Sequence, residues 1–317
     1  MKTDFFRQLI LDKILSLKSN SGFEKLLFKI LLLLNNKFGN ENDLVKYNLD
    51  GHDIILLSSH ELPILRKFHP QYSENIGRIT KYLKDKYDGL KVIDIGANAG
   101  DTVYIIKSYC DVPILCIEGN QKYFLLLQEN IKYWDDVFAE KTFIGNADFG
   151  NADYVFSKGS GNITKTSKVN PDIVFEELTT VLERNNNFKD FKFIKIDTDG
   201  FDCRIIKNEI NLIDSAKPVV FFEYDPYLFH TADDNGFSVF ASLKQAGYNK
   251  LLVYDNIGDY LLTTSMNDEK MLEDIHHFFS GRQKEKYCDL CAFHDDDTDL
   301  AEEIRKKELS FFREFRK

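Results

Sequence analysis

The sequence has no long apolar run. Its longest, Leu26–Leu34, spans nine residues and includes Lys29, whereas a membrane-spanning helix needs about 18 or more apolar residues. The start of the chain mixes Asp and Lys into its apolar residues, which is not typical of a secretory signal. We therefore expect a cytoplasmic protein, with the inner face of the membrane as the alternative location.

Cysteine is scarce, and its number is odd. Five cysteines in 317 residues argue against a disulfide framework and favour a reducing compartment. Cys288 and Cys291 form a C-x-x-C pair, but a structural zinc would need a second pair, and the other three cysteines do not supply one. We predict that this pair is buried in a core strand as small hydrophobic residues.

Positive charge is also in short supply, with 41 basic against 51 acidic residues and a net charge of −10. This balance argues against a nucleic-acid partner, which would need a basic surface to neutralise phosphates. Residues 1–37 have the opposite balance, seven basic to three acidic. This basic, amphipathic start predicts helices packed on the main domain or on a second subunit of a homodimer. The alternative is peripheral contact with an anionic membrane surface.

The remaining pattern is that of a folded α/β protein. Apolar residues spaced by three and four predict helices over 4–18 and 23–36, with Ser21 and Glu24 forming a capping box between them. Later, strand-like runs alternate with helix-like stretches, which favours right-handed crossovers and a mainly parallel sheet. The seven predicted strands are 91–95, 114–118, 141–145, 191–197, 219–224, 250–254 and 287–294.

We therefore predict a doubly wound, seven-strand α/β sheet of the Rossmann-like type with a helical N-terminal extension. A long interval precedes the last strand, which allows that strand to run in the other direction. The predicted parts are the helical extension 1–50, a strand/helix cap segment 51–90, the α/β domain 91–294, and a charged C-terminal helix or tail 295–317.

A glycine loop follows the first strand of the α/β domain. Gly96 and Gly100 allow positive φ and a close approach of the backbone to a ligand. The loop lies at the carboxyl end of a parallel strand, where ligands bind. Asp94 and Asp101 on either side make a pyrophosphate unfavourable, whereas Asp94 suits a cationic group. The structural alternative is a tight turn capped by Asp101.

Acidic residues follow the next two predicted strands. Glu118 stands where a carboxylate can accept both hydroxyls of a ribose. Its alternative role is to cap the next helix, which Asn120 could do instead. Asp148 follows the third predicted strand and is suited to accept from the amino group of adenine.

This ordered series resembles class I S-adenosylmethionine-dependent methyltransferases. The runs DIGANAGDT, IEGN, FIKIDTDGFD and VVFFEYDP resemble the FkbM-type branch of that superfamily, and the similarity extends from about Ser58 to His294. One motif departs from the common Asp-x-Glu-Gly, since Asp199 replaces the Glu here.

The resemblance implies S-adenosylmethionine as cofactor. The glycine loop would hold its methionine part, Glu118 its ribose and Asp148 its adenine, and the segment before the loop would cover it. The implied cofactor-binding residues are Tyr72, Ser73, Asp94, Gly96, Ala97, Asn98, Gly100, Asp101, Thr102, Glu118, Gly119, Asn120, Asp148 and Asp197.

Candidates for the acceptor side follow the fourth and fifth predicted strands. Two acids there can take a proton from an acceptor hydroxyl or raise one another's pKa. They can also cap the next helix, and Mg²⁺ held by them is an alternative to the predicted absence of metal. The candidate catalytic residues are Asp197, Asp199, Glu223 and His230. Ser160, Gly161 and Asn162 predict either a mobile lid or a plain surface loop.

By resemblance, the function is O-methyl transfer to a sugar hydroxyl of a bacterial surface glycan or its precursor. Three alternatives stay open at this stage. They are a methyltransferase acting on a small-molecule natural product, a non-catalytic scaffold or partner subunit that keeps the fold, and a dehydrogenase-like nucleotide enzyme.

Overall fold

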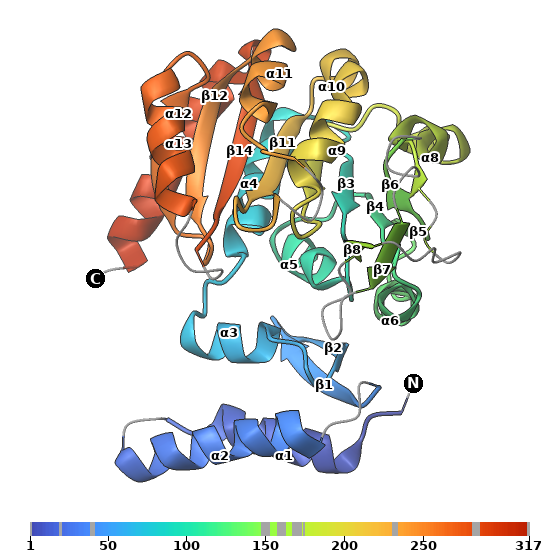
Figure 1. Cartoon of the computed structure of the whole chain (residues 1–317), viewed down its shortest axis with the longest axis vertical. Helices are drawn as coiled ribbons and strands as arrows, with labels where there is room; N and C mark the ends of the chain where they lie inside the picture. The colour runs from blue at the N-terminus through green and yellow to red at the C-terminus, as the bar shows by residue number, and fades with distance from the viewer. Residues whose placement is uncertain are drawn as a thin grey trace.

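An eight-stranded sheet forms the centre of the molecule (Figure 1). The computed structural model describes residues 2–18, 21–38, 42–146, 153–156, 163–166, 173, 175–229, 234–280 and 286–315. In spatial order the strands are β13 (Tyr260–Ser265), β12 (Tyr248–Asp255), β14 (Cys288–His294), β11 (Val219–Tyr224), β10 (Phe193–Ile196), β3 (Val92–Ile95), β4 (Ile114–Ile117) and β5 (Val137–Glu140).

The strand directions confirm the doubly wound α/β fold. Strands β11, β10, β3, β4 and β5 are parallel, while β14 runs antiparallel to both of its neighbours. The last strand does therefore differ in direction, and β13 adds an eighth strand that the sequence analysis did not include. Chain order reverses between β3 and β10, and ligands of open α/β sheets bind outside the carboxyl ends of the strands at such a point.

The predicted third strand, 141–145, is wrong. Only Phe143–Ile144 (β6) is extended there, and it pairs with β9 (Phe175–Glu176) outside the main sheet. The third strand along the chain in the main sheet is β5, an edge strand in which only Val137 is fully buried. Its apolar signal is therefore weak, whereas the run at 141–145 is apolar because it lines a pocket.

Helices cover both faces of the sheet. Side chains alternate along each strand, so that Val92 faces one core cluster and Ile93 the other. The helices of the first face are α4 (Glu74–Lys86), α5 (Asp101–Tyr109), α6 (Gln121–Ile131) and α13 (Thr298–Phe315). Those of the second are α8 (Leu178–Arg184), α9 (Asp202–Asn208), α10 (Ile210–Ala216), α11 (Val239–Gln245) and α12 (Glu269–Phe279).

The C-terminal helix α13 docks on the α/β domain through a buried ion pair. Arg78 of α4 donates to both carboxylate oxygens of Glu308 at 2.9 and 2.8 Å, and its guanidinium lies 4.2 Å from the centre of the Phe311 ring. Cys288 and Cys291 are fully buried in β14, as predicted.

The N-terminal part forms a separate layer below the sheet in Figure 1. The main chain amide of Glu24 donates to the Ser21 hydroxyl at 3.1 Å and that of Ser21 to the Glu24 carboxylate at 3.3 Å, which confirms the predicted capping box. The elements are α1 (Phe5–Ser16), α2 (Gly22–Phe38), β1 (Leu44–Leu49), β2 (His52–Leu57) and α3 (Leu62–Phe68). Elsewhere lie β7 (Asp153–Phe156), β8 (Ile163–Thr166) and the short 3₁₀ helices η1 (Asn186–Phe188) and η3 (Asp295–Asp297).

Candidate functional site

Two adjoining pockets lie at the point where chain order reverses. Counted together with the open space at its mouth, the smaller pocket has a volume of about 630 Å³ and the larger one about 1210 Å³. The residues that line both are Gly96, Asn98, Tyr123, Asp197 and Asp199. The two pockets therefore form one continuous groove, which passes over the loop after β3 and the end of β10.

The loop after β3 packs directly against β10 because Gly96 has no side chain. A Cβ on Gly96 would lie 1.8 Å from the main-chain oxygen of Asp197, and the φ of Gly96 is +81°. Asn98 also has a positive φ, of 48°, and its side-chain oxygen accepts from the amide of Ala99 at 2.8 Å. Asn tolerates a positive φ better than most residues do. Asn98 can therefore occupy a position of this loop at which a second glycine is common.

Glu118 follows β4 and is fixed by two main-chain amides. Its carboxylate accepts from Asn98 at 2.9 Å and from Asn120 at 2.7 Å. Burial raises the pKa of Glu118 to about 7, although these two hydrogen bonds oppose the shift. The side chain of Asn120 accepts from the amide of Lys122 at 2.9 Å and caps α6. Glu118 is therefore not the cap, and its carboxylate faces the groove.

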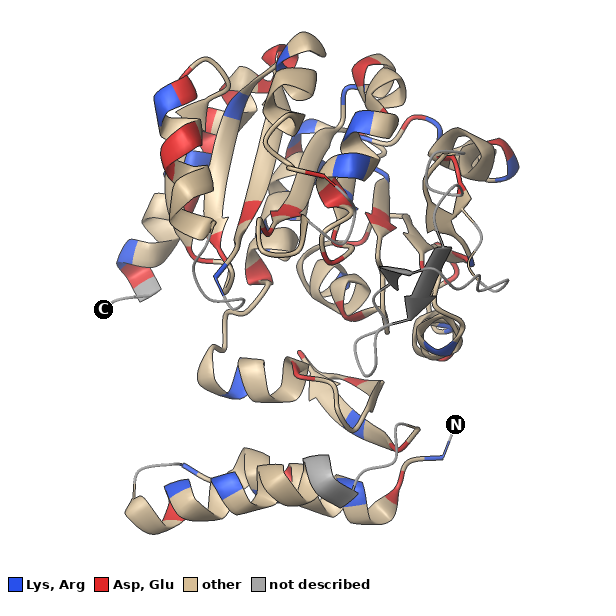
Figure 2. Cartoon of the chain, viewed as in Figure 1, with Lys and Arg blue, Asp and Glu red and all other residues tan. Residues whose placement is uncertain are grey.

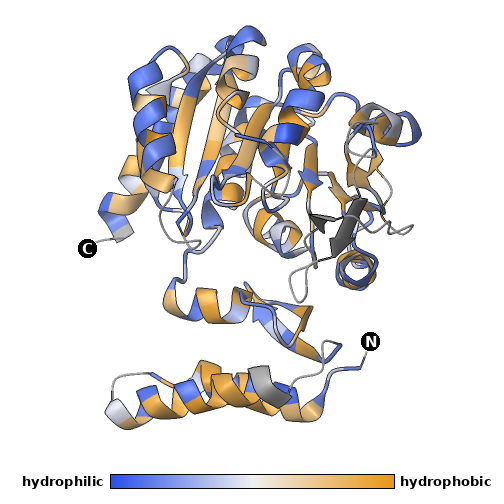
Figure 3. Ribbon diagram, viewed as in Figure 1, coloured by the Kyte–Doolittle hydropathy of each residue, from blue (hydrophilic) through white to orange (hydrophobic). Residues whose placement is uncertain are grey.

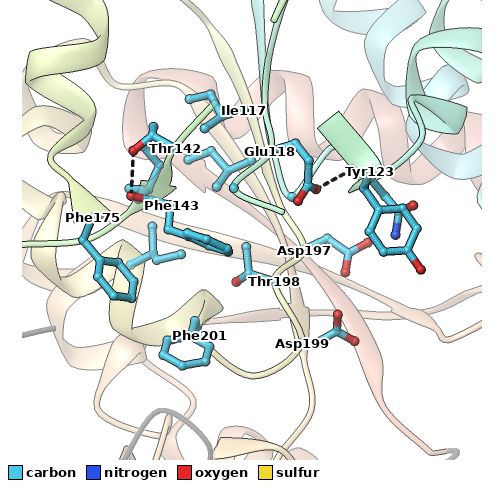
Figure 4. Close-up of a pocket in the computed structure, with 16 residues that line it drawn as sticks. Ile117, Glu118, Tyr123, Thr142, Phe143, Phe175, Asp197, Thr198, Asp199 and Phe201 are labelled. Carbon is cyan, nitrogen blue, oxygen red and sulfur yellow. Dashed lines mark hydrogen bonds between the residues drawn. The ribbon is translucent and has the colours of Figure 1, made fainter. Parts of the chain in front are cut away.

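The smaller pocket is an apolar slot (Figure 4). The rings of Phe143 and Phe175 lie 5.8 Å apart at one wall. A Cβ on Gly119 would lie 2.4 Å from the Phe143 ring, so glycine is required for this close contact. The other apolar residues of the slot are Ile95, Ile117, Ile144, Phe201 and Ile205. Flat, apolar walls beside a carboxylate suit an aromatic base joined to a ribose.

A buried ion pair lies under the glycine loop. Lys195 stands opposite Asp94 in the β3–β10 pairing, and its ammonium is 3.1 Å from Asp94 and 3.4 Å from Asp197. Burial lowers the pKa of Lys195, but the two carboxylates outweigh this effect and raise it, so Lys195 stays charged. Asp94 is fully buried, and its second oxygen has no hydrogen-bond partner.

Asp202 is a structural acid. Its carboxylate accepts from the amides of Thr198 and Gly200 at 3.1 and 3.2 Å, and it is buried. Asp199, with a φ of 52°, lies in the turn that these bonds close. Since Asp202 satisfies the turn, Asp197 and Asp199 are left to line the groove.

Glu223 lines the larger pocket near the end of β11. Only 9% of it is exposed, and its side chain has no hydrogen-bond or ion-pair partner among the described residues. It is paired in register with Asp289 of β14. Burial raises the pKa of Glu223 well above its ordinary value, and the nearby carboxylates, including Asp197 and Asp289, raise it further.

Two tyrosines complete the larger pocket. Tyr72 precedes α4 and Tyr287 precedes β14, and both side chains line this pocket. Tyr287 is not among the residues predicted from the sequence. Because β14 is antiparallel, its first residues lie at the same edge of the sheet as the carboxyl ends of β10 and β11. That direction was the signal which could have located this residue.

Most of the residues that the sequence predicts for the site line one of the two pockets. These are Tyr72, Ser73, Gly96, Asn98, Asp101, Thr102, Glu118, Gly119, Asp197, Asp199 and Glu223. Asp94, Ala97, Gly100 and Asn120 line neither of these two pockets. Asp148, His230 and the segment Ser160, Gly161 and Asn162 lie outside the described residues.

Metal coordination by Asp197 and Asp199 gains no support from the geometry. Among the described residues, no three His, Cys, Asp or Glu side chains are grouped so that they could hold a metal ion.

Comparison with known proteins gives one informative match. The family model "Methyltransferase FkbM domain" matches residues 94–250, which include the glycine loop, Glu118 and Glu223. No curated protein matches the chain.

Solved structures of methyltransferases are similar only at a low level. The N-methyltransferase NodS from Bradyrhizobium japonicum WM9 is 10% identical over 74% of this chain and 92% of that chain, with a TM-score of 0.39. An O-methyltransferase from Bacillus cereus is 12% identical over 69% of this chain and 80% of that chain, with a TM-score of 0.37. Similarity at this level carries no argument about the activity of this chain.

Proposed function

Because the chain carries an FkbM-type methyltransferase domain, we propose that it transfers a methyl group from S-adenosylmethionine to a hydroxyl of a sugar in a bacterial surface glycan or its precursor. The observation that carries the proposal is the continuous groove. It joins an apolar slot and a fixed carboxylate to a second pocket lined by acids and tyrosines.

The residues of the smaller pocket fit the donor. The slot at Phe143 and Phe175 accepts the adenine, and Glu118 accepts hydrogen bonds from the ribose hydroxyls. Gly96 and Asn98 of the loop line both pockets, so the methionine part lies against the backbone of this loop. Asp94 lies beneath it in an ion pair with Lys195 and supports the loop.

Bound S-adenosylmethionine supplies a methyl group on a positively charged sulfur, which makes that methyl reactive without further activation. The chain has two tasks, which are to orient the acceptor oxygen in line with the carbon–sulfur bond and to take its proton. Glu223 is the candidate for the second task. Its raised pKa makes the ionised Glu223 a stronger base than an ordinary carboxylate.

The larger pocket favours a polyhydroxylated acceptor. Asp197, Asp199 and Glu223 offer carboxylate oxygens as hydrogen-bond acceptors, and Tyr72 and Tyr287 add aromatic rings that can lie against apolar sugar faces. An amine acceptor is the chemical rival, since the same carboxylates would also bind an ammonium group. The choice between oxygen and nitrogen is part of the test.

Two measurements test the proposal. Calorimetry with S-adenosylmethionine, its demethylated product and NAD should show binding of the first two alone, and binding of NAD alone would overturn the assignment. Mass spectrometry of surface glycans from cells with and without the gene should then show the loss of one CH₂ unit from a sugar. The lost CH₂ unit should return when the wild-type gene is restored, and it should not return with the Glu223→Gln variant.

The remaining outcomes separate the alternatives. If the chain binds the donor, leaves the glycan unchanged and methylates a compound in an extract of small metabolites, its substrate is a natural product. Donor binding without transfer to any extract would indicate a scaffold. Fragmentation of the methylated sugar distinguishes an O-methyl from an N-methyl product.

A further inference from the structure

The N-terminal helix pair presents apolar side chains to solvent. Phe23, Leu26, Ile30 and Leu33 of α2 are 74%, 57%, 43% and 66% exposed. Their spacing of three, four and three residues places them on one side of a helix. On α1, the exposed apolar residues are Phe5, Phe6 and Leu9, at 83%, 55% and 56%.

The opposite side of the pair is fixed to the rest of the chain. Ile10 and Ile14 of α1 are buried. The buried Arg7 donates to the main-chain oxygens of Leu34 and Asn35 and pairs with Asp43 at 3.1 Å. The side-chain amide of Asn35 donates to Ser58 at 2.8 Å. These contacts hold the pair in place without using its exposed apolar side chains.

Basic residues accompany the exposed apolar ones. Lys13, Lys25 and Lys29 are exposed, and Figure 2 shows basic residues along both helices. Of the three acids in residues 1–37, Asp4 caps α1 and Glu24 belongs to the capping box. The chain as a whole is acidic, with a net charge of −10, whereas residues 1–37, which carry these apolar side chains, hold seven basic and three acidic residues.

The pair also lies far from the sheet, as the lowest layer in Figures 1 and 3, where both helices are largely apolar in colour. Within the described ranges, no helix combines the length and apolar character needed to cross a bilayer. Apolar side chains with flanking lysines on a helix parallel to a surface are what an interfacial helix requires.

We propose that α1 and α2 dock on the surface of an anionic membrane. Lys13, Lys25 and Lys29 lie at the lipid headgroups. The apolar side chains that insert are those of Phe5, Phe6, Leu9, Phe23, Leu26, Ile30 and Leu33. Charge complementarity favours this partner over a second copy, because two copies would bring like-charged lysines together. This proposal does not depend on the methyl-transfer reaction.

Co-sedimentation of the full chain with vesicles tests the proposal. Binding is expected with phosphatidylcholine mixed with phosphatidylglycerol, and it should weaken with salt and with phosphatidylcholine alone. Lys25→Glu with Lys29→Glu should weaken binding about 20-fold or more, since each lysine near an anionic surface contributes about fivefold. Phe23→Ser with Leu33→Ser should weaken it about tenfold or more.

The controls are Leu125→Ser and Leu261→Ser, which remove exposed apolar side chains (44% and 48% exposed) elsewhere on the surface. They should leave binding unchanged. Circular dichroism checks that all variants fold. Absence of vesicle binding would overturn the proposal. So would a dimer, seen by sedimentation velocity, that the Phe23→Ser, Leu33→Ser variant dissociates and that does not bind vesicles.

Discussion

The two halves of the groove are built in different ways. The donor half depends on close backbone and apolar contacts, such as Gly96 against Asp197 and Gly119 against Phe143. The acceptor half is made of side chains from distant segments, with Tyr72, Glu223 and Tyr287 meeting at one edge of the sheet. The first arrangement fixes one ligand shape, while the second can change its specificity by single substitutions.

The largest effect is expected from Gly96→Ala. The new Cβ would meet the main-chain oxygen of Asp197 at 1.8 Å, and backbone cannot move aside as a side chain can. We expect S-adenosylmethionine binding to fall below detection in calorimetry. Gly89→Ala is the control, since Gly89 also has a positive φ but nothing within 4 Å. It should cost about 1–2 kcal/mol of stability and leave donor affinity unchanged. Equal loss of binding in both variants would contradict the steric explanation.

Glu223→Gln should separate the halves. Gln keeps the size of the side chain but cannot take a proton, so we expect methyl transfer to fall about 10²–10⁴-fold. Donor affinity should stay within about threefold, because Glu223 lines only the larger pocket. The measurements are the methylated fraction of the surface glycan in complemented cells and calorimetry on the purified variant. A comparable loss of donor affinity would place Glu223 in the donor half instead.

Glu118→Gln should act on the donor half through pH. Because the ionised carboxylate accepts the ribose hydroxyls and its pKa is about 7, wild-type donor affinity should fall by up to tenfold for each pH unit below about 7. The Gln variant should bind about 10–100-fold more weakly at pH 8 and show little pH dependence from pH 5 to 8. A wild-type affinity that is constant over this range would refute the assignment of Glu118.

The Glu118 carboxyl should also affect the free energy of unfolding, and its raised pKa determines the direction of that effect. The folded chain holds the proton more tightly than the unfolded chain does, so the free energy of unfolding should fall as pH rises from about 4.5 to about 7. A shift of this size corresponds to about 3 kcal/mol. Denaturant titrations of wild type and Glu118→Gln at both ends of this window measure it, and the variant should lack this part of the decrease.

The donor half was largely accessible from sequence because its features are local. Gly96, Asn98 and Glu118 each follow directly from one strand, and a parallel sheet brings such strand ends together. The slot was partly missed. Phe175 and Phe201 come from segments whose approach to β4 depends on tertiary packing. In addition, the third strand of the main sheet along the chain is the weakly apolar edge strand β5 and not the predicted strand 141–145.

The acceptor half was harder to predict because its residues are far apart in the chain. Glu223 was accessible as an acid at a strand end, but the position of Tyr287 depends on the antiparallel direction of β14. Asp202 illustrates the opposite case, since an acid in a functional motif proved to close a turn. Short-range patterns cannot distinguish a capping acid from one that faces a ligand.

The smallest effect is expected from Tyr72→Phe, which tests how far the acceptor half depends on single hydrogen bonds. The substitution keeps the ring but removes a hydroxyl from the lining of the larger pocket, and a neutral hydrogen bond contributes about 0.5–1.5 kcal/mol. Methyl transfer at low acceptor concentration should therefore fall about two- to tenfold, with donor affinity unchanged. Tyr104→Phe is the matched control, because its hydroxyl donates to Asn130 at 3.0 Å outside both pockets and its loss should lower only the melting temperature. If Tyr72→Phe instead weakens donor binding, Tyr72 covers the donor and belongs to the donor half of the groove.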